Sequence, residues 1–153
     1  MISKSEKTIK PDKKVQAKKT RKDEYIYAVG RRKTATVRVR LYPNKEGNII
    51  VNEKPIDQYF FGECYKKIYL EPLRICNVIG KYLITIKVKG SGKMGQLGAV
   101  IHGVSRVLAK LNEEKFKPLL RKRGFLTRDP RKRERRKVGM GGKARRKRQS
   151  PRR

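Results

Sequence analysis

Two stretches of the chain, residues 36–41 and 82–89, alternate apolar residues with residues that, apart from Leu83, are threonine or charged. A period of two predicts strands with one buried face. Residues 25–29 are apolar throughout, which predicts a strand buried on both faces. Residues 49–51 predict a short strand, and the turn-forming residues at 43–48 predict that it forms a hairpin with the strand before it.

Helical spacing of apolar residues predicts a second layer. The longest stripe covers residues 96–111 and is wide enough to pack on a sheet. A shorter amphipathic helix is predicted for residues 113–123, ended by Gly124, and a helical turn is predicted near residues 56–60. Together these elements predict an α+β domain of two layers, with helices packed on a sheet.

The segment between the two halves of the predicted sheet gives a weaker signal. The pattern from residue 64 to residue 70 is ambiguous between helix and strand. A helix is predicted to start at residues 71–73, because Pro72 would then occupy an early position where its missing N–H costs little. Gly80 is expected to stop this helix.

The chain is strongly basic: 44 Lys and Arg residues against 13 Asp and Glu residues give a net charge of +31. Ordinary soluble domains carry a net charge of magnitude about 2–8, so solubility alone does not explain this excess. The charge favours a polyanionic partner, with nucleic acid first and an anionic membrane surface as the alternative.

Charge and apolar content divide the chain into three parts. Residues 1–23 are Lys-rich without a sustained period, which predicts a disordered basic N-terminal extension. Residues 24–126 hold the predicted elements and form the globular domain. Residues 127–153 contain few large aliphatic residues, so we expect an extended basic tail that a polyanion must order.

A glycine-rich loop, Gly90-Ser91-Gly92-Lys93-Met94-Gly95, lies between a predicted strand and the longest predicted helix. It fits the pattern G-x-G-x-x-G, but the context of a doubly wound dinucleotide-binding sheet is missing. Two interpretations stay open. In the first, backbone N–H groups and the helix N-terminus bind an RNA phosphate. In the second, the glycines provide a tight turn that requires positive φ.

Residues typical of catalytic or metal sites are few. His102 is the only histidine and is interpreted as a structural residue that contacts the backbone. Cys64 and Cys76 match neither a zinc-binding nor a disulfide spacing, and no acids pair for proton transfer. We expect no cofactor, no metal and no enzymatic activity. With no apolar run of about 18–20 residues and no secretory segment, we expect a cytoplasmic protein without membrane association.

Several motifs carry a family resemblance over some four-fifths of the chain, from about Tyr25 to the C-terminus. They are Gly30-Arg31-Arg32-Lys33, Asn52-Glu53-Lys54-Pro55-Ile56-Asp57-Gln58-Tyr59-Phe60, Lys89-Gly90-Ser91-Gly92, Gly95-Gln96-Leu97-Gly98-Ala99, His102-Gly103, Leu126-Thr127-Arg128-Asp129, Glu134-Arg135-Arg136-Lys137-Val138-Gly139 and Lys143-Ala144-Arg145-Arg146. In order and spacing the chain resembles the bacterial type of the family of the ninth protein of the small ribosomal subunit.

The resemblance implies a four-stranded mixed sheet with helices packed on it and a left-handed βαβ crossover. It implies one copy per ribosome in the head of the small subunit, beside neighbouring head proteins and bound to the 3′-major domain of the rRNA. In this family the tail runs through rRNA and its tip reaches the anticodon stem-loop of the peptidyl-site tRNA. Here that role falls on Arg152 and Arg153, although family members usually end Gln-Phe-Ser-Lys-Arg and this chain ends Gln-Ser-Pro-Arg-Arg.

Charge pattern and resemblance together predict the rRNA-binding residues. They come from the basic turn after the first strand, the polar side of the second strand, the glycine-rich loop and the tail: Arg31, Arg32, Lys33, Arg38, Gly90, Gly92, Lys93, Gln96, Arg128, Arg131, Arg133, Arg135, Arg136, Lys137, Lys143, Arg145, Arg146 and Arg148. Residues 131–137 are expected to form a basic helix, followed by a glycine hinge at 139–142.

Two alternatives of other kinds stay open. The first is a small nucleotide-dependent enzyme that uses the glycine-rich loop, and the second is a free DNA- or RNA-binding regulator. From alternation alone, the arginine side of the second strand is as compatible with a solvated outer face as with an RNA-facing surface.

Overall fold

The computed structural model describes residues 24–134. The predicted extension 1–23 and the predicted hinge and tip of the tail, within residues 135–153, lie outside the described residues. The described part contains these elements in chain order: β1 Ile26–Arg32, β2 Ala35–Tyr42, β3 Ile49–Val51, β4 Lys54–Pro55, α1 Ile56–Tyr59, α2 Glu63–Ile75, β5 Leu83–Lys89, α3 Lys93–Leu111 and α4 Glu113–Lys122.

The strands form one sheet in the order β1-β2-β5-β3-β4. β1, β2 and β5 are antiparallel neighbours, β3 runs parallel to β5, and the two-residue β4 is antiparallel to β3. The predicted fold class is confirmed, and β4 adds a short fifth strand to the four expected. The predicted hairpin between β2 and β3 is wrong, because β5 lies between them and pairs with both. Local turn chemistry cannot reveal such a long-range pairing.

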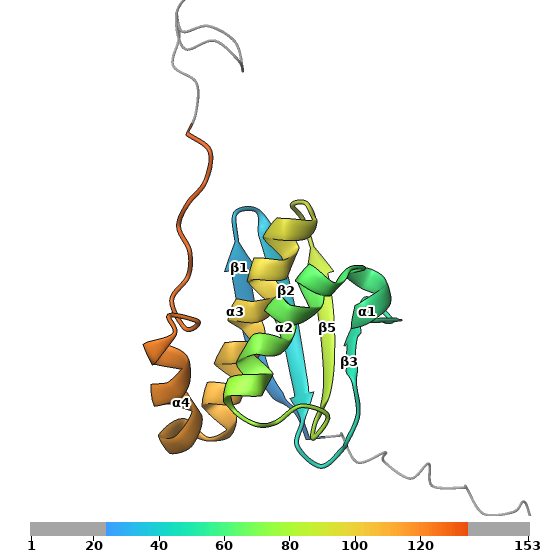
Figure 1. The fold of residues 1–153 in the computed structure, drawn as a ribbon, viewed down its shortest axis with the longest axis vertical. Coiled ribbons are helices and arrows are strands. Elements are labelled where there is room, and N and C mark those ends of the chain that lie inside the picture. The colour runs from blue at the N-terminus through green and yellow to red at the C-terminus, as the bar shows by residue number, and fades with distance from the viewer. Residues whose placement is uncertain (1–23, 135–153) are drawn as a thin grey trace, which may run out of the picture.

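The connection from β3 to β5 is a βαβ crossover, because the two parallel neighbours are joined through α1 and α2. In Figure 1 both strands point upward, the helices pass in front of the sheet, and β5 lies to the left of β3. This arrangement is left-handed, against the strong preference for right-handed crossovers. It agrees with the handedness that the family resemblance implies.

Helices α2 and α3 cover one face of the sheet, and α4 packs beside α3 (Figure 1). The predicted stripe on residues 96–111 is confirmed, although α3 begins earlier, at Lys93. The core between the layers is apolar and almost fully buried, and its main side chains are Val37, Val39, Leu41, Ile84, Ile86, Leu97, Val100, Val104, Val107 and Leu108. No described helix is long and apolar enough to cross a membrane.

The backbones of α3 and β1 approach each other closely at two glycines. A Cβ atom on Gly30 would lie 1.9 Å from the carbonyl oxygen of Ala99, and one on Gly103 would lie 2.7 Å from Cγ2 of Val39. Only a residue without a side chain permits such an approach. The contact fixes the basic turn that follows Gly30 against the middle of α3.

The prediction that the strand at residues 25–29 is buried on both faces is wrong. Tyr25 and Tyr27 are 46% and 42% exposed, whereas Ala28 is buried. The physical reason is the layer arrangement, since the described helices cover only one side of the sheet. Tyrosine suits a half-exposed strand because its ring has an apolar body and its hydroxyl reaches water.

The predicted start of a helix at residues 71–73 is also wrong, because α2 begins at Glu63 and ends at Ile75. Tyr69 and Leu73, one helical turn apart, are both buried, so packing on the core stabilises a helix where the local pattern is ambiguous. Pro72 lies in the last turn, where its missing N–H costs one backbone hydrogen bond while its ring is buried.

Candidate nucleic-acid interface

The predicted basic turn is the tip of the β1–β2 hairpin. β1 ends at Arg32 and β2 begins at Ala35, and Lys33 adopts a φ of 51° to complete the turn. Arg31 and Lys33 are exposed, whereas Arg32 is half-buried. The tip therefore presents two of its three cations to solvent and turns the third toward the protein.

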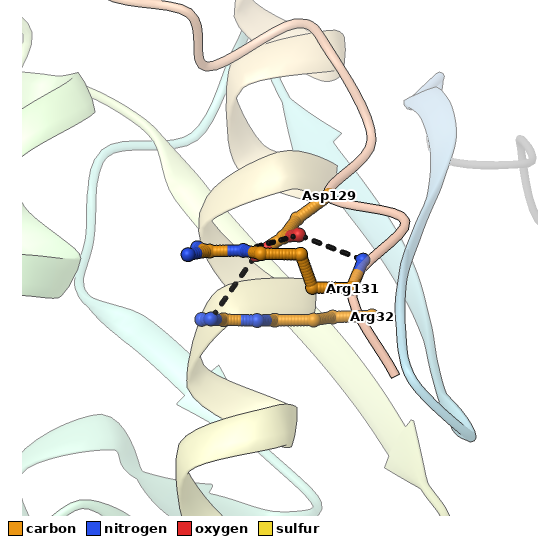
Figure 2. A network of polar contacts seen from close by, with 3 residues as sticks. All are labelled: Arg32, Asp129 and Arg131. Atoms are coloured by element: carbon orange, nitrogen blue, oxygen red, sulfur yellow. Dashed lines mark hydrogen bonds and ion pairs between the residues drawn. The ribbon is translucent and has the colours of Figure 1, made fainter. Parts of the chain in front are cut away.

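Arg32 is held by an ion-pair network at the start of the tail, in residues 125–133, which we call the root of the tail (Figure 2). Its Nη2 atom lies 3.2 Å from Oδ2 of Asp129. Arg131 contacts the same carboxylate through Nη2 at 2.9 Å, Nε at 3.0 Å and its backbone N–H at 3.0 Å. These hydrogen bonds from Arg131, with the nearby charge of Arg32, hold the pKa of Asp129 well below its usual range. One carboxylate thus joins the hairpin to the chain that leaves α4.

The Arg32 side chain lies across α3 on its way to Asp129. A Cβ atom on Gly98 would lie 2.3 Å from its Cδ, so the glycine provides the space for the arginine stem. The Arg32 Nε atom is buried and has no hydrogen-bond partner among the described residues. Arg32, predicted to bind rRNA, is thus built into the protein and positions the tail.

His102 supports the same junction from α3. Its Nδ1 accepts a hydrogen bond from the backbone N–H of Arg31 at 3.2 Å, and the ring also contacts the backbone of Leu126. Burial, with the nearby charge of Arg106, lowers the pKa of His102 below its ordinary value. The interpretation of His102 as a backbone-contacting structural residue is confirmed, and the imidazole is neutral at physiological pH.

The root of the tail is fixed, but the predicted basic helix is not formed at its start. Phe125 and Leu126 pack against the core, as expected. Residues 131–134 have no regular structure, although Asp129 accepts from the Arg131 N–H as a helix-capping residue would. Cations in a first turn meet the positive end of the helix dipole, which disfavours the helix here. Residues 135–137 lie outside the described residues.

The glycine-rich loop is a braced turn. Gly90 has a φ of 83°, and a Cβ atom there would lie 2.5 Å from the carbonyl oxygen of Thr34. The Gln96 side chain donates to the Gly90 carbonyl at 3.1 Å and accepts from the Tyr59 hydroxyl at 2.9 Å. The Lys93 ammonium lies 3.1 Å from the Tyr59 carbonyl oxygen. The tight-turn interpretation accounts for Gly90, and Lys93 and Gln96 have structural contacts of their own.

The same geometry disfavours the dinucleotide interpretation. The loop follows β5, which pairs with antiparallel β2 in a sheet whose described helices cover one face. A dinucleotide site requires a parallel sheet with helices on both faces and a switch point between them. Gly92 has an extended backbone with a φ of −92°, and a Cβ atom there would have no neighbour within 4 Å. This position therefore needs no glycine-specific conformation.

Arg38 points to the sheet face that the helices leave uncovered. It is exposed, and the register places it directly opposite Lys87 of β5, with Thr36 opposite Lys89 on the same face. Like charges directly opposite each other destabilise a sheet. An anion between Arg38 and Lys87 would remove this repulsion, so the face is suited to phosphate.

The described residues bring part of the predicted set together. Arg31 and Lys33 at the hairpin tip lie beside the root of the tail, which carries Arg128, Arg131 and Arg133 as exposed side chains. Gly90, Gly92, Lys93 and Gln96 form the neighbouring loop. The remaining predicted residues lie outside the described residues: Arg135, Arg136, Lys137, Lys143, Arg145, Arg146, Arg148, Arg152 and Arg153.

Two kinds of contributing residue escape sequence reasoning. Asp129 lies within a recognised motif, but its partner Arg32 is distant in the chain and no local signal connects them. Arg106 and Lys110, on the polar side of α3, donate to the carbonyls of Val29 at 2.6 Å and Tyr27 at 2.9 Å. They satisfy the open edge of β1, and only the topology shows that β1 is an edge strand.

Comparison with known proteins decides between the candidate classes. The family model described as ribosomal protein S9/S16 matches residues 30–153, which include every predicted RNA-binding residue. The chain belongs to the ribosomal protein S9/S16 family. The match begins at the glycine that precedes the basic hairpin tip, and it includes this tip, the glycine-rich loop and the root of the tail. The predicted family is confirmed.

Two bacterial relatives have the same degree of similarity. "Small ribosomal subunit protein uS9" of Anaeromyxobacter sp. (strain K) and the protein of the same name from Anaeromyxobacter dehalogenans (strain 2CP-1 / ATCC BAA-258) are each 47% identical over 114 residues. Each alignment covers 74% of this chain and 86% of the relative. This S9-family protein is therefore of the bacterial type.

Proposed function

We propose that this S9-family protein is a structural constituent of the small ribosomal subunit that binds rRNA in the subunit head and catalyses no reaction. The family match over residues 30–153 carries the proposal. The net charge of +31 supplies the attraction that a polyanionic partner requires. The protein acts in the cytoplasmic ribosome, at one copy per small subunit, beside other head proteins.

The domain docks through one end of its sheet. Arg31 and Lys33 at the hairpin tip and Arg128 and Arg131 at the root of the tail form a cationic surface joined by the Arg32–Asp129 ion pair. Arginine suits this task because its planar fork binds phosphate oxygens in pairs. The braced loop and Arg38 extend the surface toward the 3′-major domain of the rRNA.

The tail carries the finer part of the proposal. Residues 127–153 leave the domain at a fixed root and run between rRNA helices, where an extended chain of about 3.3 Å per residue fits and a globule does not. Arg152 and Arg153 at the tip contact the anticodon stem-loop of the peptidyl-site tRNA. Residues 1–23 lie outside the family match, and we propose that they add a basic arm to a domain of residues 24–126.

Sedimentation tests the assignment. The native protein, detected by antibody in a cell lysate separated on a sucrose gradient, is expected in the small-subunit fraction at one copy per rRNA molecule. Material found mainly at the top of the gradient would instead indicate a free nucleic-acid-binding regulator and overturn the proposal.

Deleting residues 149–153 tests the role of the tip. The truncated protein is expected to assemble into small subunits as the full chain does, because the hairpin and the root of the tail are intact. Peptidyl-site tRNA is expected to dissociate faster from these subunits, since the terminal arginines are lost. A filter-binding measurement of tRNA retention that shows no change would remove Arg152 and Arg153 from the proposed site.

A further inference from the structure

The uncovered sheet face carries a corner of aromatic and cationic side chains. Tyr25 precedes β1 and Tyr42 ends β2, and their ring centroids lie 5.8 Å apart with an interplanar angle of 56°. The guanidinium carbon of Arg40 lies 5.0 Å from the centre of the Tyr25 ring. Tyr25 is 46% exposed and Tyr42 is half-buried. Two tyrosines from neighbouring strands therefore offer one aromatic surface, which we call the Tyr25–Arg40–Tyr42 corner.

A hollow continues from this corner across the sheet. Its lining includes the cations Arg38, Arg40 and Lys87, the single acid Glu53, and the apolar side chain of Ile50. The lining of the hollow is therefore positively charged and includes an apolar side chain. A bound anion would relieve the repulsion between Arg38 and Lys87, which face each other across the strands. A phosphate would not explain the exposed tyrosine rings, because it has no flat surface to stack on them.

We propose that this surface binds a single-stranded RNA segment, with an unpaired base stacked on the Tyr25–Arg40–Tyr42 corner and the adjoining phosphates over Arg38 and Lys87. The inference rests on the proposed function and names the kind of RNA that the sheet face recognises. Aromatic side chains stack on bases of any sequence, and arginine adds cation–π attraction. In a duplex the base faces are stacked inside the helix, so a duplex would contact the cations but could not stack a base on the tyrosines.

An acidic protein segment is the other occupant that the charge would permit. RNA is favoured because the exposed rings and the cations lie within one contiguous face, which matches the alternation of bases and phosphates along a single strand. Under the proposed function, the rest of the protein's basic surface also binds nucleic acid. Sequence reasoning misses the corner because Tyr25 and Tyr42 become neighbours only when β1 pairs with β2, and the basic tail, residues 127–153, contains no aromatic residue.

Binding of two matched oligomers tests the stacking. The full-length protein is titrated into fluorescently labelled oligouridine of about twelve nucleotides, a length within the range that single-strand-binding sites occupy, and into an abasic oligomer with the same phosphates. The double variant Tyr25→Leu/Tyr42→Leu is expected to bind oligouridine about ten-fold more weakly, which corresponds to about 1.4 kcal/mol and lies within the range for one stacked base. Its affinity for the abasic oligomer is expected to equal that of the wild type.

The double variant Tyr25→Phe/Tyr42→Phe is the matched control, because phenylalanine keeps the rings and removes only the hydroxyls. It is expected to bind both oligomers as the wild type does. Circular dichroism of both variants checks that the sheet is intact. An oligouridine affinity that is equal in the wild type and the leucine variant would overturn the stacking proposal.

Photo-crosslinking in assembled subunits locates the contact independently. Small subunits that carry 5-iodouridine in their rRNA are irradiated, and crosslinked peptides are identified by mass spectrometry. A crosslink at Tyr25 or Tyr42 is expected. Crosslinks confined to the tail, or a chemical crosslink from Arg40 to an acidic protein, would refute RNA as the occupant. In either case the protein would still sediment with small subunits, so failure here differs from failure of the proposed function.

Discussion

The substitution Gly30→Ala tests whether the close approach of α3 to β1 fixes the basic hairpin. The added Cβ would lie 1.9 Å from the Ala99 carbonyl oxygen and 2.5 Å from the Gly103 nitrogen. Both are backbone atoms, so no side-chain rotation relieves the clash and the cost falls at the upper end of overpacking, about 3 kcal/mol. Alanine offsets about 0.5–1 kcal/mol of this cost, because its unfolded chain has less conformational entropy to lose than that of glycine. The free energy of unfolding should therefore fall by about 2 kcal/mol.

Thermal unfolding of the full-length protein, followed by circular dichroism in high salt, measures this loss. About 2 kcal/mol corresponds to a drop in Tm of about 8–16 °C for a domain of this size. Gly103→Ala is expected to lower Tm by less. The nearest neighbour of its added Cβ is a Val39 methyl group at 2.7 Å, and alanine is about 1 kcal/mol more favourable than glycine in a helix.

Gly92→Ala is the matched control from the glycine-rich loop. A Cβ atom there has no neighbour within 4 Å, so Tm should stay within about 4 °C of the wild type. A Gly30→Ala protein that melts as the Gly92→Ala protein does would show that the helix moves away from β1 at little cost. The inference that this contact positions the hairpin tip would then be wrong.

Three further predictions concern charge and reactivity. Asp129→Asn should speed backbone hydrogen exchange at the root of the tail. Because the pKa of Asp129 is lowered in the folded protein, the difference in exchange rate between the variant and the wild type should be full above about pH 4. This difference should shrink as the pH falls below that value. In binding titrations with rRNA at several salt concentrations, Lys33→Gln should reduce the magnitude of the slope of log K against log salt concentration by about 0.7–0.9. The control Lys67→Gln, on α2, should leave this slope unchanged. Iodoacetamide at about pH 8 should label the exposed Cys64 but not Cys76, because burial raises the pKa of the Cys76 thiol to about 11. Equal labelling of the two cysteines, measured by mass spectrometry, would contradict this prediction.

The sequence predicts those elements whose pattern one layer of packing explains. β2 and β5 alternate because one face meets the helices and the other meets solvent, and α3 carries its stripe because it lies along the sheet. The structural role of His102 can be predicted because no acid or cysteine accompanies it in sequence. The family can be predicted because its motifs keep their order and spacing from the hairpin to the tail.

The errors arise where distant residues decide the outcome. β3 pairs with β5 because the α1–α2 crossover returns the chain to that place, and no turn signal encodes the pairing. α2 extends back to Glu63 because the Tyr69 ring packs on the core and the Tyr69 hydroxyl donates a hydrogen bond to the Asp57 carboxylate. Residues 131–134 are irregular although a basic helix is expected over residues 131–137, because cations in the first turn meet the positive end of the helix dipole. In each case tertiary packing or electrostatics overrides local preference.

The arrangement at the root of the tail explains why a folded domain precedes a basic tail at all. An untethered cationic chain would bind rRNA phosphates in many registers, since electrostatic attraction carries no direction. Here Leu126 packs on the core, His102 contacts its backbone, and Asp129 ties the chain to Arg32. The first residues of the tail therefore leave the domain beside the hairpin tip, which we propose docks on the same nucleic acid. Fixing that origin removes wrong registers before the tail meets RNA, so the domain contributes direction and the tail contributes charge.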